Sequence, residues 1–191
     1  FVKILAEAGL PPGVVNVITT STSGKVSAPI IADPRLRKLS FTGSTEVGRK
    51  LYEQAAGNIL RISMELGGNA PFLIFDDADL GAAVDGAMLA KFRNIGQACT
   101  AANRFIVHEA VADEFAARVA ERVQAFKIGR GTEEDVQIGP LINDDAVQKA
   151  DALVRDATER GAKVLTGGHP IDRAGTFYEP TVVAGVRPGS D

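Results

Sequence analysis

The sequence has a single cysteine, Cys99, among its 191 residues, and it has no tryptophan. A lone cysteine cannot form a disulfide within the chain, and such low cysteine content fits a reducing compartment, so we expect the cytoplasm. No apolar run approaches the roughly 20 residues needed to span a bilayer. The formal net charge of −3 provides no basic field for nucleic acid or an anionic membrane. We therefore expect neither nucleic acid nor a membrane as a partner.

Hydrophobic residues make up 45% of the chain, which is enough to form a sizeable core in one domain or two lobes. The chain begins with Phe1 rather than methionine, already inside a helical pattern, and it ends in a polar Pro-Gly-Ser-Asp sequence. It shows no signal peptide. We therefore expect these residues to be an internal segment of a longer protein.

Hydrophobic periodicity and turn signals predict an α/β chain. Helices are expected over residues 2–8, 26–32, 44–56, 79–93, 111–126 and 144–160. Strands are expected over residues 14–18, 38–42, 61–66, 71–75, 104–108, 163–165 and 178–183. Strands that alternate with short helices favour right-handed crossover units in a parallel sheet.

Cys99 lies in a predicted loop, residues 91–104, between a helical pattern and an apolar strand. Free cysteine is often a buried small hydrophobe, so a packing role is one interpretation. The neighbouring residues argue for chemistry instead, because loops on a scaffold carry much of a protein's function. Those neighbours are small or polar: Asn94, Gly96, Gln97, Thr100 and Asn103. The thiol would need a helix terminus or a nearby cation in order to ionise.

Two further motifs could take part in ligand binding or catalysis. The sequence FTGSTEVG, residues 41–48, is expected at a strand-to-helix junction, where unpaired amides and the helix dipole can hold a phosphate. It lacks the G-x-G-x-x-G fingerprint, and its glycines could equally serve only a turn or close packing. Glu65 lies in MELGG, residues 64–68, at the end of an apolar strand. Such a carboxylate either caps a turn or, with a raised pKa, acts as a base.

In this order and spacing, the motifs closely resemble the aldehyde dehydrogenase superfamily over the whole chain. The matching blocks are PGVVNV (12–17), FTGSTEVG (41–48), ELGG (65–68), FDDADL (75–80), GQAC (96–99), IGPLI (138–142), GAKVLTGG (161–168) and EPTV (179–182). The cysteine loop is most similar to that of succinate-semialdehyde dehydrogenases. Arg93 decides this similarity, because many relatives have an apolar or aromatic residue at that position.

The resemblance implies an α/β fold with part of a Rossmann-like coenzyme domain, residues 1–64, followed by part of an α/β catalytic domain, residues 65–191. It implies NAD or NADP as coenzyme, a small aldehyde as substrate and a homo-oligomeric full-length protein. Similarity to bacterial relatives favours NADP. By the same resemblance, the strand that sets this choice precedes these residues, and the E-x-F-G-P block that contacts the nicotinamide ribose follows them.

The resemblance also implies roles for individual residues. Cys99 would attack the aldehyde to give a thiohemiacetal and then a thioester, and Glu65 would activate the water that hydrolyses it. The Cys99 backbone N–H and an asparagine upstream of Phe1 would hold the oxyanion. Arg93 would bind the far carboxylate of succinate semialdehyde, which would be oxidised to succinate. The implied coenzyme-binding residues are Gly43, Ser44, Thr45, Glu46, Val47, Gly48, Leu66 and Gly67.

Several alternatives remain open from the sequence. Arg93 could be a cation at a helix C-terminus, a role compatible with substrate binding. Cys99 and His108 could form a cysteine hydrolase, or the chain could be a non-catalytic scaffold. No metal site is expected, because neither histidine has a partner at metal-ligand spacing. Ala101 occupies the position where some relatives have a second cysteine, so we expect no redox switch of that kind.

Overall fold

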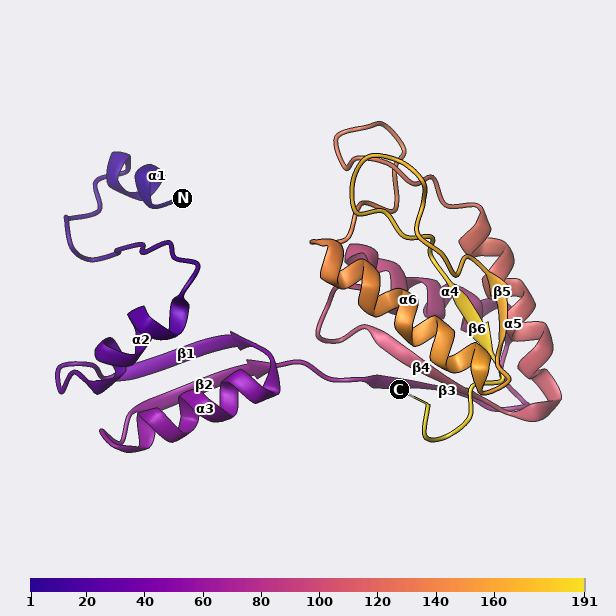
Figure 1. Cartoon of the computed structure of the whole chain (residues 1–191), viewed down its shortest axis with the longest axis horizontal. Coiled ribbons are helices and arrows are strands. Elements are labelled where there is room, and N and C mark those ends of the chain that lie inside the picture. Colours follow the sequence, from indigo (N-terminus) through magenta and orange to yellow (C-terminus); the bar gives the residue numbers. More distant parts are fainter. Residues whose placement is uncertain (191) are drawn as a thin grey trace. The chain divides into compact units, whose positions relative to one another are not determined.

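The computed structural model describes residues 1–190 as a mixed α/β chain, so the predicted fold class is confirmed. The chain divides into two compact units, Phe1–Gly67 and Gly68–Asp191 (Figure 1). The first unit contains α1 (Val2–Glu7), α2 (Ser23–Ala32), β1 (Lys38–Gly43), α3 (Thr45–Ala56) and β2 (Arg61–Leu66). The second contains β3 (Ala70–Ile74), α4 (Leu80–Phe92), the short turn η1 (Arg93–Gly96), β4 (Ala102–Val107), α5 (Glu109–Gln124), α6 (Asp144–Glu159), β5 (Lys163–Thr166) and β6 (Val182–Ala184). Among these residues, no helix is both long and apolar enough to cross a membrane.

The first unit is built on a parallel pair of strands. β1 and β2 run in register from the pair Lys38–Arg61 to the pair Gly43–Leu66, and α3 connects them. α3 packs on both strands and on α2. The Asn58 side-chain amide donates a hydrogen bond of 3.1 Å to the backbone carbonyl of Ile31, which joins the end of α3 to the end of α2. This unit therefore has one parallel crossover.

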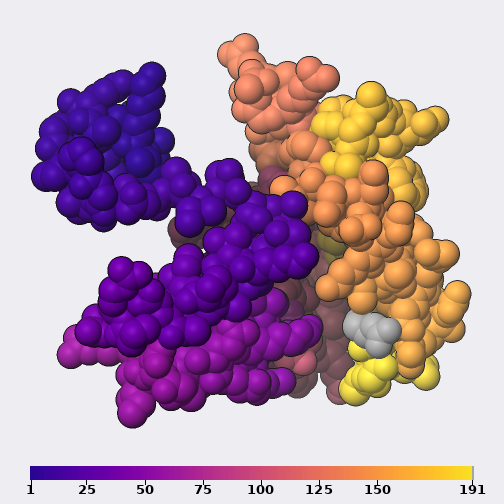
Figure 2. All heavy atoms as spheres, turned by 60° about the vertical axis from the view of Figure 1, so that its left-hand side comes forward, coloured from indigo at the N-terminus to yellow at the C-terminus, as the bar shows by residue number. Residues whose placement is uncertain are grey.

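The predicted strand over residues 14–18 is wrong, because this segment is irregular. Val14, Val17 and Ile18 are each more than 60% exposed. A strand needs a neighbour to satisfy its backbone groups, and no described strand pairs with this segment. Figure 2 shows the first residues, in the darkest indigo, as a group of atoms with a narrow connection to the remainder of their unit.

The core of the second unit lies between the parallel pair β3–β4 and the helices α4 and α5. Its buried members are Ile74, Val84, Ala87, Met88, Phe115, Val119 and Val123. Alternate strand residues point toward these helices. The Phe105 ring has its centroid 5.5 Å from that of Phe72 and 6.1 Å from that of Phe115. Aromatic contacts therefore join both strands to α5.

The opposite face of the β3–β4 pair exposes large apolar side chains beside the charged Arg104. Leu73 on β3 and Ile106 on β4 each retain 56% of their accessible surface. Full burial of a large aliphatic side chain stabilises a protein by about 1.5–3 kcal/mol relative to full exposure. This face is therefore suited to packing against further protein.

The remaining pair, β5–β6, is antiparallel, so the predicted parallel arrangement holds for only two of the three pairs among the described strands. α5 contacts both strands of this pair and α6 contacts β5 (Figure 1). The predicted strand over residues 178–183 is displaced, because regular pairing begins at Val182. Pro180 has no N–H to donate, and Thr181 Oγ1 instead accepts a 2.9 Å hydrogen bond from the Gly168 N–H.

Candidate functional site

Two sequence blocks predicted to serve the coenzyme come together in the first unit. Gly43 pairs with Leu66, and Thr42 pairs with Glu65, at the carboxyl ends of β1 and β2. The Gly67 N–H donates a 3.3 Å hydrogen bond to the Gly43 carbonyl. Parallel strands end at the same edge of a sheet, which is where open α/β sheets bind ligands. The Glu65 side chain is exposed at this edge.

The junction after β1 has an exposed helix N-terminus. Ser44 is the N-cap of α3, and its Oγ accepts a 3.3 Å hydrogen bond from the Val47 N–H. Thr45, Glu46 and Val47 are exposed. The helix dipole favours an anion ahead of such a terminus. Glu46 pairs instead with Lys50 at 2.6 Å, and this hydrogen bond with its ammonium lowers the pKa of the Glu46 carboxyl below its ordinary value.

Gly48 is buried and has a packing role. A Cβ at this position would lie 2.6 Å from Leu66 Cδ2. The absence of a side chain therefore allows α3 to pack closely on β2, which is one of the two roles that the sequence left open for these glycines. Gly48 and Leu66, both predicted to serve the coenzyme, are thus in contact through packing.

In the second unit, Cys99 lies in a turn between η1 and β4, and its side chain is exposed. The Ala101 N–H donates a 3.0 Å hydrogen bond to the Ala98 carbonyl, which closes this turn. Ala101 and Ala102 directly after it are only 3% exposed. The buried residues on one side of the turn therefore anchor an accessible thiol. The interpretation of Cys99 as a buried packing residue does not hold for this chain.

The backbone just before the turn is left-handed over three successive residues. Asn94 has φ 53°, Ile95 has φ 53° and Gly96 has φ 77°. A β-branched residue with positive φ is a genuine outlier, and such strain persists only where surrounding structure imposes it. A Cβ at Gly96 would lie 2.9 Å from the Lys91 carbonyl oxygen. The chain therefore reverses direction sharply between α4 and the cysteine.

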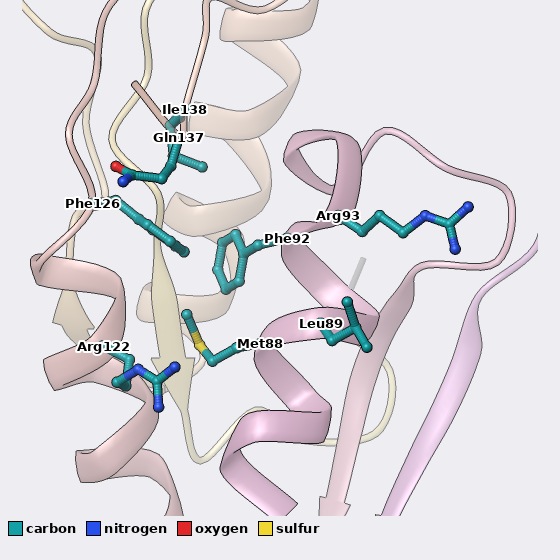
Figure 3. Close-up of a pocket in the computed structure, with 8 residues that line it drawn as sticks. All are labelled: Met88, Leu89, Phe92, Arg93, Arg122, Phe126, Gln137 and Ile138. Atoms are coloured by element: carbon teal, nitrogen blue, oxygen red, sulfur yellow. The ribbon is translucent and has the colours of Figure 1, made fainter. Parts of the chain in front are cut away.

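Arg93 follows the last residue of α4 and is exposed. It borders an open cavity of about 370 Å³, whose other lining residues are Met88, Leu89, Phe92, Arg122, Phe126, Gln137 and Ile138. Figure 3 shows the Arg93 side chain pointing away from the rings of Phe92 and Phe126, which meet edge to face with centroids 5.0 Å apart. The Arg93 guanidinium is therefore free to meet a ligand outside the cavity, and its position also suits the helix C-terminus.

Comparison with known proteins supports the family that the order of the sequence motifs suggested. The model of the aldehyde dehydrogenase family matches residues 1–191.

The chain belongs to the aldehyde dehydrogenase family.

Among its relatives, a succinate-semialdehyde dehydrogenase of Paenarthrobacter nicotinovorans is 54% identical over 186 residues, which cover 97% of this chain and 41% of that protein. The succinate-semialdehyde dehydrogenase [NADP(+)] of Escherichia coli (strain K12) is 49% identical, with 96% of this chain and 38% of that protein covered. A glutarate-semialdehyde dehydrogenase of Pseudomonas putida is 49% identical, with 97% and 38% covered.

A crystal structure of succinate-semialdehyde dehydrogenase from Burkholderia pseudomallei aligns with the whole chain at a TM-score of 0.95 and 47% identity, and the chain covers 39% of that structure. The resemblance found from the motifs is therefore confirmed. The chain spans about two fifths of the length of the relatives it matches.

The predicted site residues of this aldehyde dehydrogenase segment fall in both units. Glu65 and the coenzyme residues of the 43–48 and 66–67 blocks share one strand edge in the first unit. Cys99 and Arg93 lie in the same loop between α4 and β4 in the second unit. In the described part of the chain, His, Cys, Asp and Glu side chains form no group of three or more that could hold a metal ion.

The structure does not support a Cys99–His108 pair. Cys99 precedes β4, and His108 follows it as the N-cap of α5. The 6 residues of β4 separate them by roughly 20 Å at about 3.3 Å per residue. His108 Nδ1 instead accepts a 3.3 Å hydrogen bond from the Ala110 N–H. A cysteine hydrolase using these two residues is therefore excluded.

The sequence pattern predicts no role for three polar residues around the cysteine loop, although Asn103 is one of the polar neighbours of Cys99. Lys91 Nζ donates a 2.7 Å hydrogen bond to Asn103 Oδ1, and Asn103 Nδ2 donates one of 2.7 Å to Asn69 Oδ1. Lys91 is half-buried, and burial lowers the pKa of its ammonium below the ordinary value. The available sequence signal was weak: two asparagines and a lysine that flank the ELGG and GQAC motifs.

The conformation of Gly96 leads to a stability prediction. In the full-length protein, Gly96→Ala should lower the free energy of unfolding by about 1–2 kcal/mol, because its backbone is left-handed and its methyl group would meet the Lys91 carbonyl. The measurement is a shift in the denaturation midpoint. Gly131→Ala is the matched control, since a Cβ there meets nothing within 4 Å. Equal shifts in both variants would contradict the conformational requirement at Gly96.

Proposed function

We propose that this chain is part of an NAD(P)-dependent aldehyde dehydrogenase that oxidises succinate semialdehyde to succinate. The observation that carries the proposal is the exposed thiol of Cys99, held on a turn between strained backbone and buried alanines. The family match over residues 1–191 places this turn within an aldehyde dehydrogenase sequence. The proposed activity belongs to the full-length protein.

Cys99 Sγ, as the thiolate, attacks the aldehyde carbon and forms a C–S bond, and the carbonyl oxygen becomes the oxyanion of a thiohemiacetal. The Cys99 backbone N–H is one donor that stabilises this oxyanion. Loss of hydride from the same carbon leaves a thioester. Glu65 removes a proton from water, the resulting hydroxide adds to the thioester, and the C–S bond breaks to release the acid and the thiolate. These roles require Glu65 to be near Cys99 in the full-length protein.

NAD or NADP supplies the hydride acceptor when it is bound. The groups that fit its phosphates are backbone amides at the N-terminus of α3, which Ser44 caps and where Thr45 and Glu46 are exposed. This terminus adjoins Leu66 and Gly67 at the same strand edge. Backbone amides and the helix dipole provide the attraction for an anion without a G-x-G-x-x-G loop. The NADP(+) named for the Escherichia coli relative supports NADP as the coenzyme.

The substrate is proposed to be a short aldehyde with a carboxylate at its other end. Arg93 carries an exposed guanidinium six residues before Cys99, in the same loop. Arginine binds carboxylates through two parallel hydrogen bonds and stays charged at every working pH. The succinate- and glutarate-semialdehyde dehydrogenase names of the relatives support an acidic substrate. Glutarate semialdehyde, one carbon longer, is the second candidate.

A comparison of the full-length protein with residues 1–191 alone tests this proposal. With succinate semialdehyde and either coenzyme, the full-length protein should form reduced nicotinamide. The isolated chain should not, because it spans about two fifths of its relatives and leaves the apolar side chains of Leu73 and Ile106 exposed, which promotes association. Absorbance of the reduced coenzyme is the measurement. A full-length protein that oxidises neither semialdehyde would reject the proposed function. Specific turnover by residues 1–191 alone would reject the expectation that the isolated chain is inactive.

A further inference from the structure

The loop that carries Cys99 is closed at its base by side chains from three segments. Lys91 lies in the last turn of α4, Asn103 lies in the first part of β4, and Asn69 directly precedes β3. Their hydrogen bonds, 2.7 Å from Lys91 to Asn103 and 2.7 Å from Asn103 to Asn69, join the two ends of the loop to the neighbouring strand. All three residues belong to the second unit.

The chemistry of these groups gives the chain of hydrogen bonds one direction. An ammonium has three donors and no acceptor, so the side chain of Asn103 must turn its oxygen toward Lys91. Its NH₂ group then faces Asn69, whose oxygen accepts. An aspartate at position 69 could still accept this hydrogen bond, whereas an apolar residue could not. The donor-to-acceptor direction of these hydrogen bonds therefore predicts which substitutions at position 69 keep them and which break them.

Lys91 also contacts the strained part of the loop. A Cβ at Gly96 would lie 2.9 Å from the Lys91 carbonyl oxygen, 3.4 Å from its Cε and 3.5 Å from its Nζ. Gly96, the last of the three left-handed residues, thus lies against the backbone and the side chain of Lys91. Strained backbone needs such fixed surroundings to persist.

We infer that Lys91, Asn103 and Asn69 form a positioning clamp for the Cys99 loop, which holds the nucleophile in the orientation needed for attack. Lys91 acts through the loop backbone and is a positioning residue. The inference rests on the proposed function where turnover is concerned. The geometry of the loop can be measured without turnover.

Hydrogen exchange in the full-length protein tests the clamp directly. The reporters are the amides of Gln97 and Ala101, which donate to Asn94 and Ala98 at 3.0 Å each. Lys91→Met retains the aliphatic stem but removes the donor, so exchange of both amides should be about 10-fold faster. Asn69→Leu should act in the same direction, and Asn69→Asp should keep the exchange close to that of the unsubstituted protein. Lys149→Met, at an exposed lysine of α6, is the matched control and should change neither amide.

Turnover provides the second measurement. Lys91→Met should lower kcat for the semialdehyde by about 10-fold or more with little change in KM, because misplacing a nucleophile acts on the chemical step. Asn69→Asp should retain kcat, whereas Asn69→Leu should lower it. Unchanged exchange at Gln97 and Ala101 in Lys91→Met, or equal effects of Asn69→Asp and Asn69→Leu, would overturn the clamp. An unsubstituted protein that oxidises no aldehyde would instead reject the proposed function and leave the exchange test valid.

Discussion

Cys99→Ala in the full-length protein is expected to abolish aldehyde oxidation, including the first turnover. Alanine cannot form the C–S bond, so no thiohemiacetal arises from which hydride can leave. The thiol is exposed at its turn, so the substitution removes little packing and the protein should remain folded. The measurement is a rapid-mixing experiment that follows reduced coenzyme in the first turnover and in the steady state.

Glu65→Gln should separate the two halves of the reaction. Acylation does not need the water-activating base, so one equivalent of reduced coenzyme should still form per site. Thioester hydrolysis should then slow by about 10²–10⁴-fold, the usual scale of general-base catalysis. Glu53→Gln, at an exposed glutamate of α3, serves as the control and should behave as the unsubstituted enzyme. Equal loss of the first turnover in Cys99→Ala and Glu65→Gln would count against the assigned roles.

Arg93→Leu is expected to change which aldehydes are oxidised. A four-carbon semialdehyde places its carboxylate only a few bonds from the reacting carbon, so a cation near the nucleophile can hold one end while the thiolate attacks the other. Removing one partner of a desolvated charge pair costs about 2–5 kcal/mol. The value of kcat/KM for succinate semialdehyde should therefore fall by roughly 30- to several-thousand-fold. An uncharged aldehyde of similar length should be nearly unaffected or favoured.

The comparison between charged and uncharged aldehydes separates the two roles of Arg93. As a helix-end cation alone, it would contribute about 0.3–1 kcal/mol of stability, and its loss would affect both substrates alike. Arg130→Leu, at another exposed arginine of the second unit, controls for the loss of one positive charge. Parallel losses for both aldehydes in Arg93→Leu would reject the carboxylate contact and leave a general aldehyde dehydrogenase.

Local sequence determined the helices well, because each helix start depends on residues close in the chain. Ser44, Asp79 and Asn143 each accept a hydrogen bond from a backbone N–H three residues later, as N-caps do. The family could also be identified from sequence, since motif order requires no knowledge of packing. The predicted roles of Cys99 and Glu65 come from that resemblance and remain predictions.

Pairing between distant residues was decided only by the tertiary structure. The apolar segment 14–18 has the composition of a strand but no described partner, so its backbone stays irregular. The register that sets Glu65 opposite Thr42 depends on how α3 returns the chain to β1. The hydrogen bond from Asn103 to Asn69 spans 34 residues, and the positive φ of Ile95 opposes its intrinsic preference. Such features arise because packing around the loop outweighs local propensity, and no short stretch of sequence encodes that balance.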